Sequence, residues 1–146
     1  MEGIIWECKI VMRIYLAHSG EEDIRKKAKD IQNILEKYTN IFCVNPFDSG
    51  ATAKALTHLW DEHPEQRNKE LAEEIVENDL DNVEHCDILV AYIEEPSLGT
   101  AMEIIFASRV FDMDVYIITE FESPWLISHG TIVKDINELL EVLKLK

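Results

Sequence analysis

Cysteine is scarce in this sequence, and its placement excludes a disulfide framework. The three cysteines, Cys8, Cys43 and Cys86, are an odd number, lie far apart and form no C-x-x-C pair. We interpret them as buried thiols of a protein in a reducing cytoplasm. Metal-ligand patterns are missing as well. His58 and His63 do not form an H-E-x-x-H motif, so no metal site is expected.

Positive charge is scarce too. Lysine and arginine total 14 against 29 acidic residues, which gives a formal net charge of −15. A nucleic-acid groove needs clustered basic side chains, so we expect no nucleic-acid partner. The basic residues gather mainly in RKKAKD (residues 25–30), which we interpret as the solvated face of a helix. A small anionic substrate stays compatible with this charge, because helix N-termini and one or two cations suffice to hold it.

Long hydrophobic runs are absent, so no membrane span or membrane partner is expected. The first 17 residues carry Glu2, Glu7 and Lys9, and no small-residue cleavage site follows them. We therefore interpret them as a lead-in and a first strand, not as a signal peptide. The G-x-G-x-x-G, P-loop and G-x-S-x-G motifs are also missing. Together these absences predict a cytoplasmic protein without a cofactor.

The sequence does contain a regular alternation of strand and helix patterns. Its 146 residues, 47% hydrophobic and 29% charged, are typical of one globular domain spanning residues 1–146. Apolar, β-branched runs predict buried strands, and apolar residues at helical spacing predict helices between them. The expected strands are residues 9–17, 41–44, 87–93, 114–119 and a short 131–134. The expected helices are residues 21–38, about 61–85, the part of 94–110 that follows a loop at 96–100, and 135–144.

This alternation predicts a three-layer α/β fold of the flavodoxin-like kind. Its sheet should have about five strands, mostly parallel, with helices on both faces. Ser19 is the expected N-cap of the first helix, and residues 45–54 are expected to form a turn-rich loop. Open sheets of this kind bind ligands at the C-terminal ends of their strands, so the site is expected there.

Glu103 lies in that region and has two interpretations. Thr100 and Glu103 have the S/T-x-x-E spacing of a capping box, in which the glutamate only closes the helix start. Alternatively, a carboxylate held by a rigid helix among apolar residues at the strand ends serves as a nucleophile or base. Asp79 raises a similar question, because it shares a stripe with Ile75 and Val76. It either caps a new short helix after a break, or faces the site.

Several of these residues together resemble a known family. Residues 77–107 resemble the nucleoside 2-deoxyribosyltransferase family, and come closest to its hydrolase branch, the 2′-deoxynucleoside 5′-monophosphate N-glycosidases. The family pattern runs N/Q-D-L, a spacer, S/A-D, a strand, then S/D-x-G-x-x-x-E. It is matched here by Asp79-Leu80, Asp87, Ser97-Leu98-Gly99 and Glu103. Tyr15 and Ser19 fit the family's tyrosine and loop-serine positions in and after the first strand.

The resemblance implies a double displacement at the anomeric carbon of a deoxyribosyl unit. Glu103 would attack and expel the base, and water or a second base would then attack the covalent intermediate. Tyr15 would orient the carboxylate, and Asp79 would contact the leaving base and help to protonate it. The substrate would be a deoxynucleotide or deoxynucleoside, and the assembly a homodimer or larger homo-oligomer.

Ser97 points to the hydrolase branch. The transferases that take free nucleosides place a carboxylate at this position, and a carboxylate would repel a 5′-phosphate that a serine hydroxyl attracts. Ser97, Gly99 and Ser19 are therefore the expected phosphate donors. The first loop departs from that branch, because Glu21 stands where it has an arginine and His18 where it has a glycine. Arg25 or a partner chain would then have to supply the charge.

Three further substrate-binding candidates complete the site. They are His18 in the first loop, Phe47 after the second strand, and Ser128, in the segment expected to come from a partner chain. Two other functions stay open. One is a transferase that exchanges bases between free deoxynucleosides, and the other is a nucleotide-binding module that has lost turnover.

Overall fold

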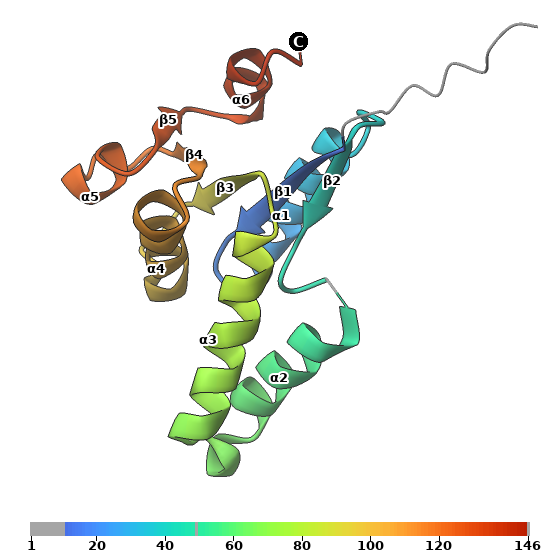
Figure 1. Ribbon diagram of the computed structural model, residues 1–146, viewed down its shortest axis with the longest axis vertical. Coiled ribbons are helices and arrows are strands. Elements are labelled where there is room, and N and C mark those ends of the chain that lie inside the picture. The colour runs from blue at the N-terminus through green and yellow to red at the C-terminus, as the bar shows by residue number, and fades with distance from the viewer. Residues whose placement is uncertain (1–10, 49, 146) are drawn as a thin grey trace, which may run out of the picture.

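The protein folds around a five-stranded, all-parallel sheet. A computed structural model describes residues 11–48 and 50–145. The strand order is β2-β1-β3-β4-β5, and all four neighbouring pairs are parallel (Figure 1). The strands are β1 (Met12–Ala17), β2 (Ile41–Val44), β3 (Ile88–Ile93), β4 (Asp114–Thr119) and β5 (Thr131–Val133). This is the flavodoxin-like order, and the predicted fold class is confirmed.

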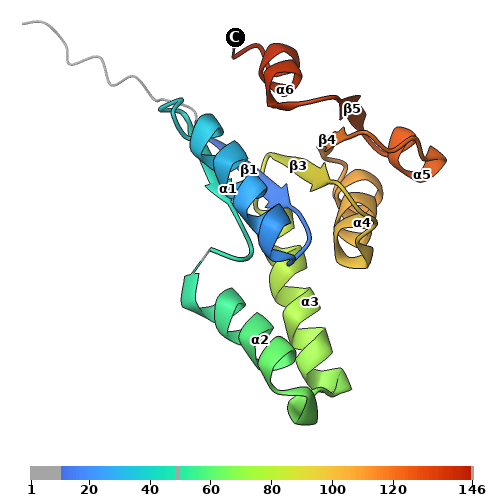
Figure 2. The ribbon, with the colours of Figure 1, turned by 180° about the vertical axis from the view of Figure 1, so that it is seen from behind.

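Helices connect the strands on both faces of the sheet. They are α1 (Glu22–Leu35), α2 (Gly50–Glu62), a 3₁₀ turn η1 (Pro64–Gln66), α3 (Lys69–Glu84), α4 (Leu98–Ile105), its π-helical continuation η2 (Phe106–Val110), α5 (Pro124–Ile127) and α6 (Ile136–Val142). The view from behind places α1 and α6 on the near side and α4 on the far side (Figure 2). The three predicted layers are therefore present.

Alternate residues of each strand divide the core into two halves. Ile14 and Leu16 point to the α1 and α6 face, where Leu35 and Leu139 are fully buried. On the other face, Tyr15 and its neighbours pack against α3 and α4; this half includes Leu89, Ala91, Ile104 and Ile117. This period-two division follows from strand geometry. It directs the Tyr15 side chain toward α4, which carries Glu103.

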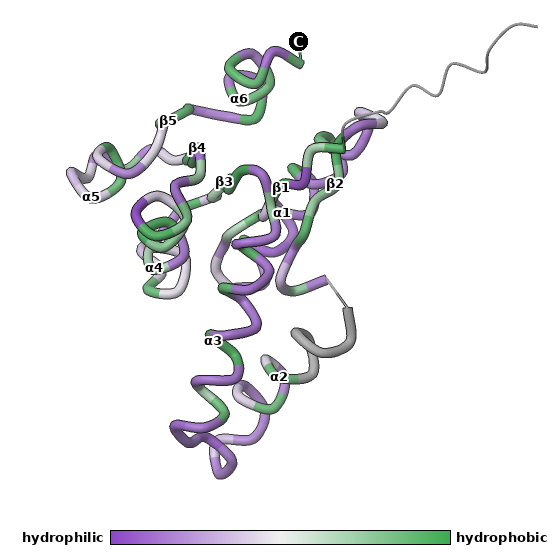
Figure 3. Tube along the Cα trace, viewed as in Figure 1, coloured by the Kyte–Doolittle hydropathy of each residue, from purple (hydrophilic) through white to green (hydrophobic). Residues whose placement is uncertain are grey.

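The connection between β2 and β3 differs from the prediction. Residues 45–54 were expected to form a loop and residues 61–85 one helix, but α2 already begins at Gly50, and His63 and η1 separate it from α3. The helices α2 and α3 pack on each other and extend past the strand ends (Figure 1). Hydrophilic residues cover most of α3 in this extension (Figure 3).

The cysteines and the helix lengths can be compared with two expectations from the sequence, buried thiols and no membrane span. Cys43 and Cys86 are buried free thiols, and burial raises their pKa values to about 12 and about 11, so both are protonated and unreactive near neutral pH. Cys8 lies outside the described residues. Among the helices that the structure describes, none has the length and apolar character of a membrane span.

Candidate active site

A tyrosine and a glutamate from different layers form the centre of the candidate site. Tyr15 is fully buried in β1, and its hydroxyl donates a hydrogen bond to Oε2 of Glu103 in α4. The two residues are far apart in the sequence, so this contact depends on the fold. The hydroxyl fixes the orientation of a half-buried carboxylate, as the resemblance implied for this pair.

The structure does not support the capping interpretation of Glu103. The N-cap of α4 is Ser97, whose Oγ accepts a hydrogen bond from the Thr100 backbone N–H at 3.5 Å. Thr100 lies inside the first turn, so Glu103 is too far along the helix to reach back to the cap. Its recorded hydrogen bond goes to Tyr15 instead. The helix start is closed without Glu103, which leaves its carboxylate for another role.

Burial and the nearby Asp79 set the protonation of this site. Burial, followed by the negative charge of Asp79, raises the pKa of Glu103 to about 8, although the Tyr15 hydrogen bond opposes the rise. Burial also raises the pKa of Asp79 to about 6. The Tyr15 hydroxyl has a pKa well above its usual value, through burial and then the Glu103 and Asp79 charges. Three perturbed groups in one place are typical of a reactive site.

Asp79 reaches this site from an unbroken helix. The alternative in which the helix breaks at Asp79 is wrong, because α3 runs continuously from Lys69 to Glu84 and its N-cap is Asn68. The Asp79 side chain is half-buried in the second half of α3. Its charge acts on both Tyr15 and Glu103, so the three groups lie within electrostatic reach of one another.

The β3–α4 loop brings Ser97 and Gly99 to the same helix. Ser97 accepts a hydrogen bond as the cap, which leaves its hydroxyl proton for another acceptor. Gly99 is exposed, and a Cβ added there would meet nothing within 4 Å, so the protein itself does not require a glycine. From the sequence, Thr100 had no expected role other than that of a possible helix cap. Within the described residues, its buried Oγ1 has no hydrogen-bond partner, which is unusual for a native structure.

The β1–α1 loop is arranged differently from the prediction. The N-cap of α1 is Glu21 and not Ser19, although Ser19 Oγ accepts a 3.4 Å hydrogen bond from the Glu21 N–H. His18 is 4% exposed and turns toward the residues after β2; its ring centroid lies 4.8 Å from that of Phe47. The Arg25 guanidinium lies over the Phe47 ring, 4.5 Å from its centroid. Arg25 thus lies beside the loop from which an arginine is missing.

Among the described residues, Ser128 and the possible metal ligands His58 and His63 make their contacts with residues other than Tyr15, Asp79 and Glu103. Ser128 is exposed at the end of α5, and its recorded side-chain contact is with His129 Nδ1 at 3.0 Å. The rings of His58 and His63 are 6.0 Å apart. Among the residues that the structure describes, no group of three or more His, Cys, Asp or Glu side chains is arranged to hold a metal ion.

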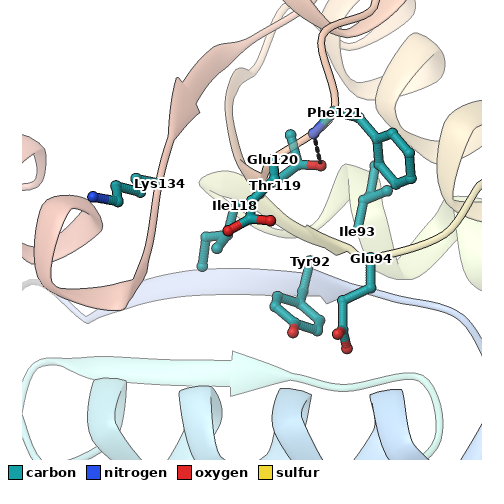
Figure 4. Close-up of a pocket in the computed structure, with 8 residues that line it drawn as sticks. All are labelled: Tyr92, Ile93, Glu94, Ile118, Thr119, Glu120, Phe121 and Lys134. Carbon is teal, nitrogen blue, oxygen red and sulfur yellow. Dashed lines mark hydrogen bonds between the residues drawn. The ribbon is translucent and has the colours of Figure 1, made fainter.

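A separate hollow of about 470 Å³ lies at the ends of β3 and β4 (Figure 4). Tyr92, Glu94, Glu120 and Lys134 contribute its polar side chains, and Tyr15, Asp79 and Glu103 do not line it. Glu94 is already paired with Lys27 at 2.7 Å. Two carboxylates in one hollow disfavour an anionic substrate, so we do not assign the substrate to it.

Comparisons with known proteins give matches in structure only. No family model matches the sequence, and no curated protein matches it either. A 2-deoxyribosyltransferase from Bacillus psychrosaccharolyticus superposes with a TM-score of 0.63 at 20% identity, covering 87% of this chain and 89% of its own. A CMP N-glycosidase from Clostridium botulinum superposes with a TM-score of 0.54 at 22% identity, covering 92% and 99%.

The chain has the fold of these two enzymes. They are a transferase and a glycosidase, the two kinds of enzyme that the motif in residues 77–107 resembles. At this level of identity the match is one of fold. The site residues rest on the motif spacing, on the hydrogen bond from Tyr15 to Glu103 and on the electrostatic effect of Asp79 on both.

Proposed function

We propose that this protein cleaves the N-glycosidic bond of 2′-deoxynucleoside 5′-monophosphates and releases the free base. The observation that carries the proposal is the Glu103 carboxylate, which is held by the Tyr15 hydroxyl and influenced by the charge of Asp79. This arrangement occurs on a fold shared with a deoxyribosyltransferase and a CMP N-glycosidase. The 146 residues would act as one domain, in the cytoplasm and without a cofactor.

The reaction would proceed by double displacement. Ionised Glu103 attacks the anomeric carbon, the bond to the base breaks, and the base leaves with the electron pair and takes a proton from Asp79. Water then attacks the same carbon, gives its proton to Asp79 and releases Glu103. Tyr15 holds the attacking carboxylate in place in both steps.

The pKa values define the form of the enzyme that reacts. With pKa values of about 6 and about 8, the Asp79 and Glu103 carboxyls together hold one proton near neutral pH. The reaction needs that proton on Asp79 and the negative charge on Glu103. The higher pKa of Glu103 favours the opposite arrangement in the free protein, so substrate binding must move the proton. An electron-rich base nitrogen beside Asp79 would favour this transfer.

The preference for a 5′-phosphate is supported by the start of α4. Ser97 offers a hydroxyl proton and Gly99 an exposed, unobstructed backbone at a helix N-terminus, where anions are stabilised. Ser19 would add a hydroxyl from the first loop. Glu21 opposes the preference, since it adds a negative charge next to that loop, while Arg25 adds a positive one close by.

The partner in the proposed assembly is a second copy of this chain. Large apolar side chains are exposed around the segment that follows β4: Trp125 is 71% exposed and Ile127 59%, and Leu98, beside Ser97, is 82% exposed. A hollow of about 570 Å³ lies between Leu98 and Trp125 and includes Ser97 in its lining. An apolar surface of this kind is typical of an interface. It would bring Ser128 of each chain toward the other chain's site.

Two alternatives are separated by one assay. In the first, the protein exchanges bases between free deoxynucleosides, and in the second it binds nucleotides without turnover. Incubation with the deoxynucleoside monophosphates, with CMP and with deoxynucleosides, with and without a second base, should release free base from the deoxynucleotides alone. Release that depends on the second base would instead indicate the transferase, and no release from any substrate would leave the binding module.

Ser97→Asp tests the phosphate preference within the same assay. A carboxylate at Ser97 replaces a donor by a negative charge, so kcat/KM for deoxynucleotides should fall about tenfold to hundredfold while nucleoside cleavage changes less. Thr39→Asp, which adds the same charge at an exposed position before β2, is the matched control. Equal losses for nucleotides and nucleosides would contradict a phosphate contact at Ser97.

A further inference from the structure

An unused hydroxyl group lies one helical turn before Glu103. Thr100 is 1% exposed, and its Oγ1 is the one buried side-chain polar atom, in the described part of the chain, that has no hydrogen-bond partner. A threonine in a helix ordinarily donates to a carbonyl oxygen three or four residues earlier, and Thr100 makes no such bond. A buried hydroxyl without a partner destabilises the fold, so its presence calls for an explanation. Capping is not the explanation, because Ser97 closes the start of α4.

Helix geometry brings the side chains of Thr100 and Glu103 to the same face of α4. Residues three apart on a helix are neighbours, and helical side chains tilt toward the N-terminus of their helix. The Glu103 side chain therefore lies over the preceding turn, which contains Gly99 and Thr100. Gly99 has no side chain, so Thr100 is the polar side chain beneath Glu103. Glu103 reaches Tyr15 in the sheet, and its neighbours Thr100 and Ile104 are each 1% exposed, so this face of α4 turns toward the core.

The two oxygens of the Glu103 carboxyl have different surroundings. The Tyr15 hydroxyl donates to Oε2, and no hydrogen bond to Oε1 is recorded among the described residues. The Tyr15 hydroxyl keeps its proton, because burial and then the Glu103 charge hold its pKa well above the usual value. In the neutral carboxyl the proton of Glu103 is therefore on Oε1, and this oxygen needs no donor. Ionisation removes that proton and leaves Oε1 as a charged acceptor in a buried place.

The groups that face Glu103 from the neighbouring elements do not stabilise its charge at Oε1. Tyr15 of β1 is already used at Oε2, and the charge of Asp79 in α3 raises the Glu103 pKa, second only to burial. Cys86, after α3, acts on Tyr15 and stays protonated, because burial raises its pKa to about 11. Strands β3 and β4 contribute apolar side chains to this half of the core, among them Leu89, Ala91 and Ile117. The uncommitted Thr100 hydroxyl is therefore the donor that an ionised Oε1 can use.

We propose that Thr100 is a positioning residue for Glu103, and that its hydroxyl turns to donate a hydrogen bond to Oε1 when the carboxylate ionises. The proposal deepens the proposed function and rests on it, because it concerns the same carboxylate. The bond forms only with the charged carboxylate, so it selectively stabilises the state that attacks the anomeric carbon. Tyr15 and Thr100 then hold one carboxylate oxygen each, and each oxygen keeps a second lone pair for the attack. The same movement gives the buried Thr100 hydroxyl its partner.

Titration of Glu103 itself tests this role directly. In protein labelled with ¹³C at the glutamate carboxyls, the Glu103 signal is the one that Glu103→Gln removes. Thr100→Val keeps the shape and removes the donor, so the midpoint of this signal should move up by about one pH unit. Thr100→Ser keeps the hydroxyl and should titrate as the wild type does. Thr119→Val is the matched control, because Thr119 is buried in β4 and its Oγ1 accepts a 3.1 Å hydrogen bond from the Phe121 N–H. It should lose stability and leave the Glu103 midpoint unchanged.

Two results of this titration would overturn the proposal. One is an unchanged midpoint in Thr100→Val, and the other is an equal rise in Thr100→Val and Thr100→Ser. Either would make the hydroxyl a matter of packing alone.

The base-release assay gives a second, independent readout. A higher Glu103 pKa keeps more of the protein in the neutral form, so Thr100→Val should lower kcat near neutral pH about tenfold with little change in KM. For the same reason the alkaline limb of kcat/KM should move to higher pH, and Thr100→Ser should restore both. A slower Thr100→Val whose alkaline limb has not moved would contradict the proposal. If no variant and no wild-type protein releases base, the proposed function fails, whereas the titration of Glu103 still decides the role of Thr100.

Discussion

At the scale of single residues, Glu103 illustrates how a buried carboxyl opposes stability. Its pKa is raised to about 8 by burial, above the value of 4.5 for a free side chain. The folded protein therefore holds this proton more tightly than the unfolded chain does. The free energy of unfolding therefore falls as pH rises from about 4.5 to about 8, because the folded state resists the ionisation of Glu103. The proposed role of Glu103 as the nucleophile accounts for this cost.

Glu103→Gln should therefore stabilise the protein. The amide has no charge to bury, and its Oε1 still accepts the Tyr15 hydrogen bond. Denaturant unfolding should show a free energy of unfolding higher than that of the wild type by at least about 1 kcal/mol at pH 8, since one pKa unit is worth about 1.4 kcal/mol. The difference should shrink toward zero below about pH 4.5.

The opposite result would identify a cap. Loss of a helix cap lowers the free energy of unfolding by about 1 kcal/mol. This loss would appear at every pH that is measured. Asp87→Ala is a useful comparison, because it removes the carboxylate that accepts a 2.7 Å hydrogen bond from the Arg13 backbone N–H. That variant should be destabilised where Glu103→Gln is stabilised.

The pH dependence of turnover should follow the two carboxyls. Base release requires one proton on the Asp79–Glu103 pair, so kcat/KM should rise to a maximum between about pH 6 and about pH 8 and fall on both sides. Asp79→Asn should remove one limb of this profile as well as lower the rate. A profile that is flat from about pH 5 to about pH 9 would show that these carboxyls do not carry the reaction.

At the scale of elements, the sequence predicted the strands better than the helix ends. Strands β2 and β4 have the predicted bounds, because short β-branched runs between turns have one stable solution in a covered sheet. The start of α4 was ambiguous, since both Ser97 and Thr100 have side chains that cap helices. In the structure Ser97 is the N-cap, and Thr100 is buried inside the first turn. The turn-like composition of residues 45–50 likewise hid the start of α2.

Gly99→Ala tests the first turn of α4. Because a Cβ would meet nothing within 4 Å, the free energy of unfolding should stay the same or rise by up to about 1 kcal/mol, the difference in helix propensity. If the backbone at Gly99 approaches a phosphate, kcat/KM for deoxynucleotides should nevertheless fall. Thermal unfolding and base release on the same preparation measure both effects. A stable variant with unchanged kcat/KM would remove Gly99 from the site.

At the scale of the whole molecule, the layered parallel architecture followed from the sequence, and the location of the site at the strand ends stays a prediction. Alternating strands and helices allow few parallel topologies, and these place ligands at the strand ends. The pairing of Tyr15 with Glu103 came from the family resemblance, and the fold confirms that the two side chains meet. The position of Arg25 over Phe47 could not be predicted, because it depends on how α1 packs beside the β2–α2 connection.

The exposed apolar surface should hold two chains together. Trp125→Asp places a charge in the middle of that surface, so sedimentation should show the wild type as a dimer or larger and the variant as a monomer. Val11→Asp, which adds the same charge at an exposed apolar residue before β1, should leave the assembly intact. A monomeric wild type would contradict the proposed partner and the contribution of Ser128.

The central claim is that Glu103 forms a bond to the sugar. Protein quenched in acid during turnover of a deoxynucleotide, then digested and analysed by mass spectrometry, should show one deoxyribosyl phosphate group on the peptide that contains Glu103. The adduct should be absent from Glu103→Gln and should decay as free base accumulates. Steady release of base by the wild type without any adduct at Glu103, or with undiminished turnover in Glu103→Gln, would contradict this account.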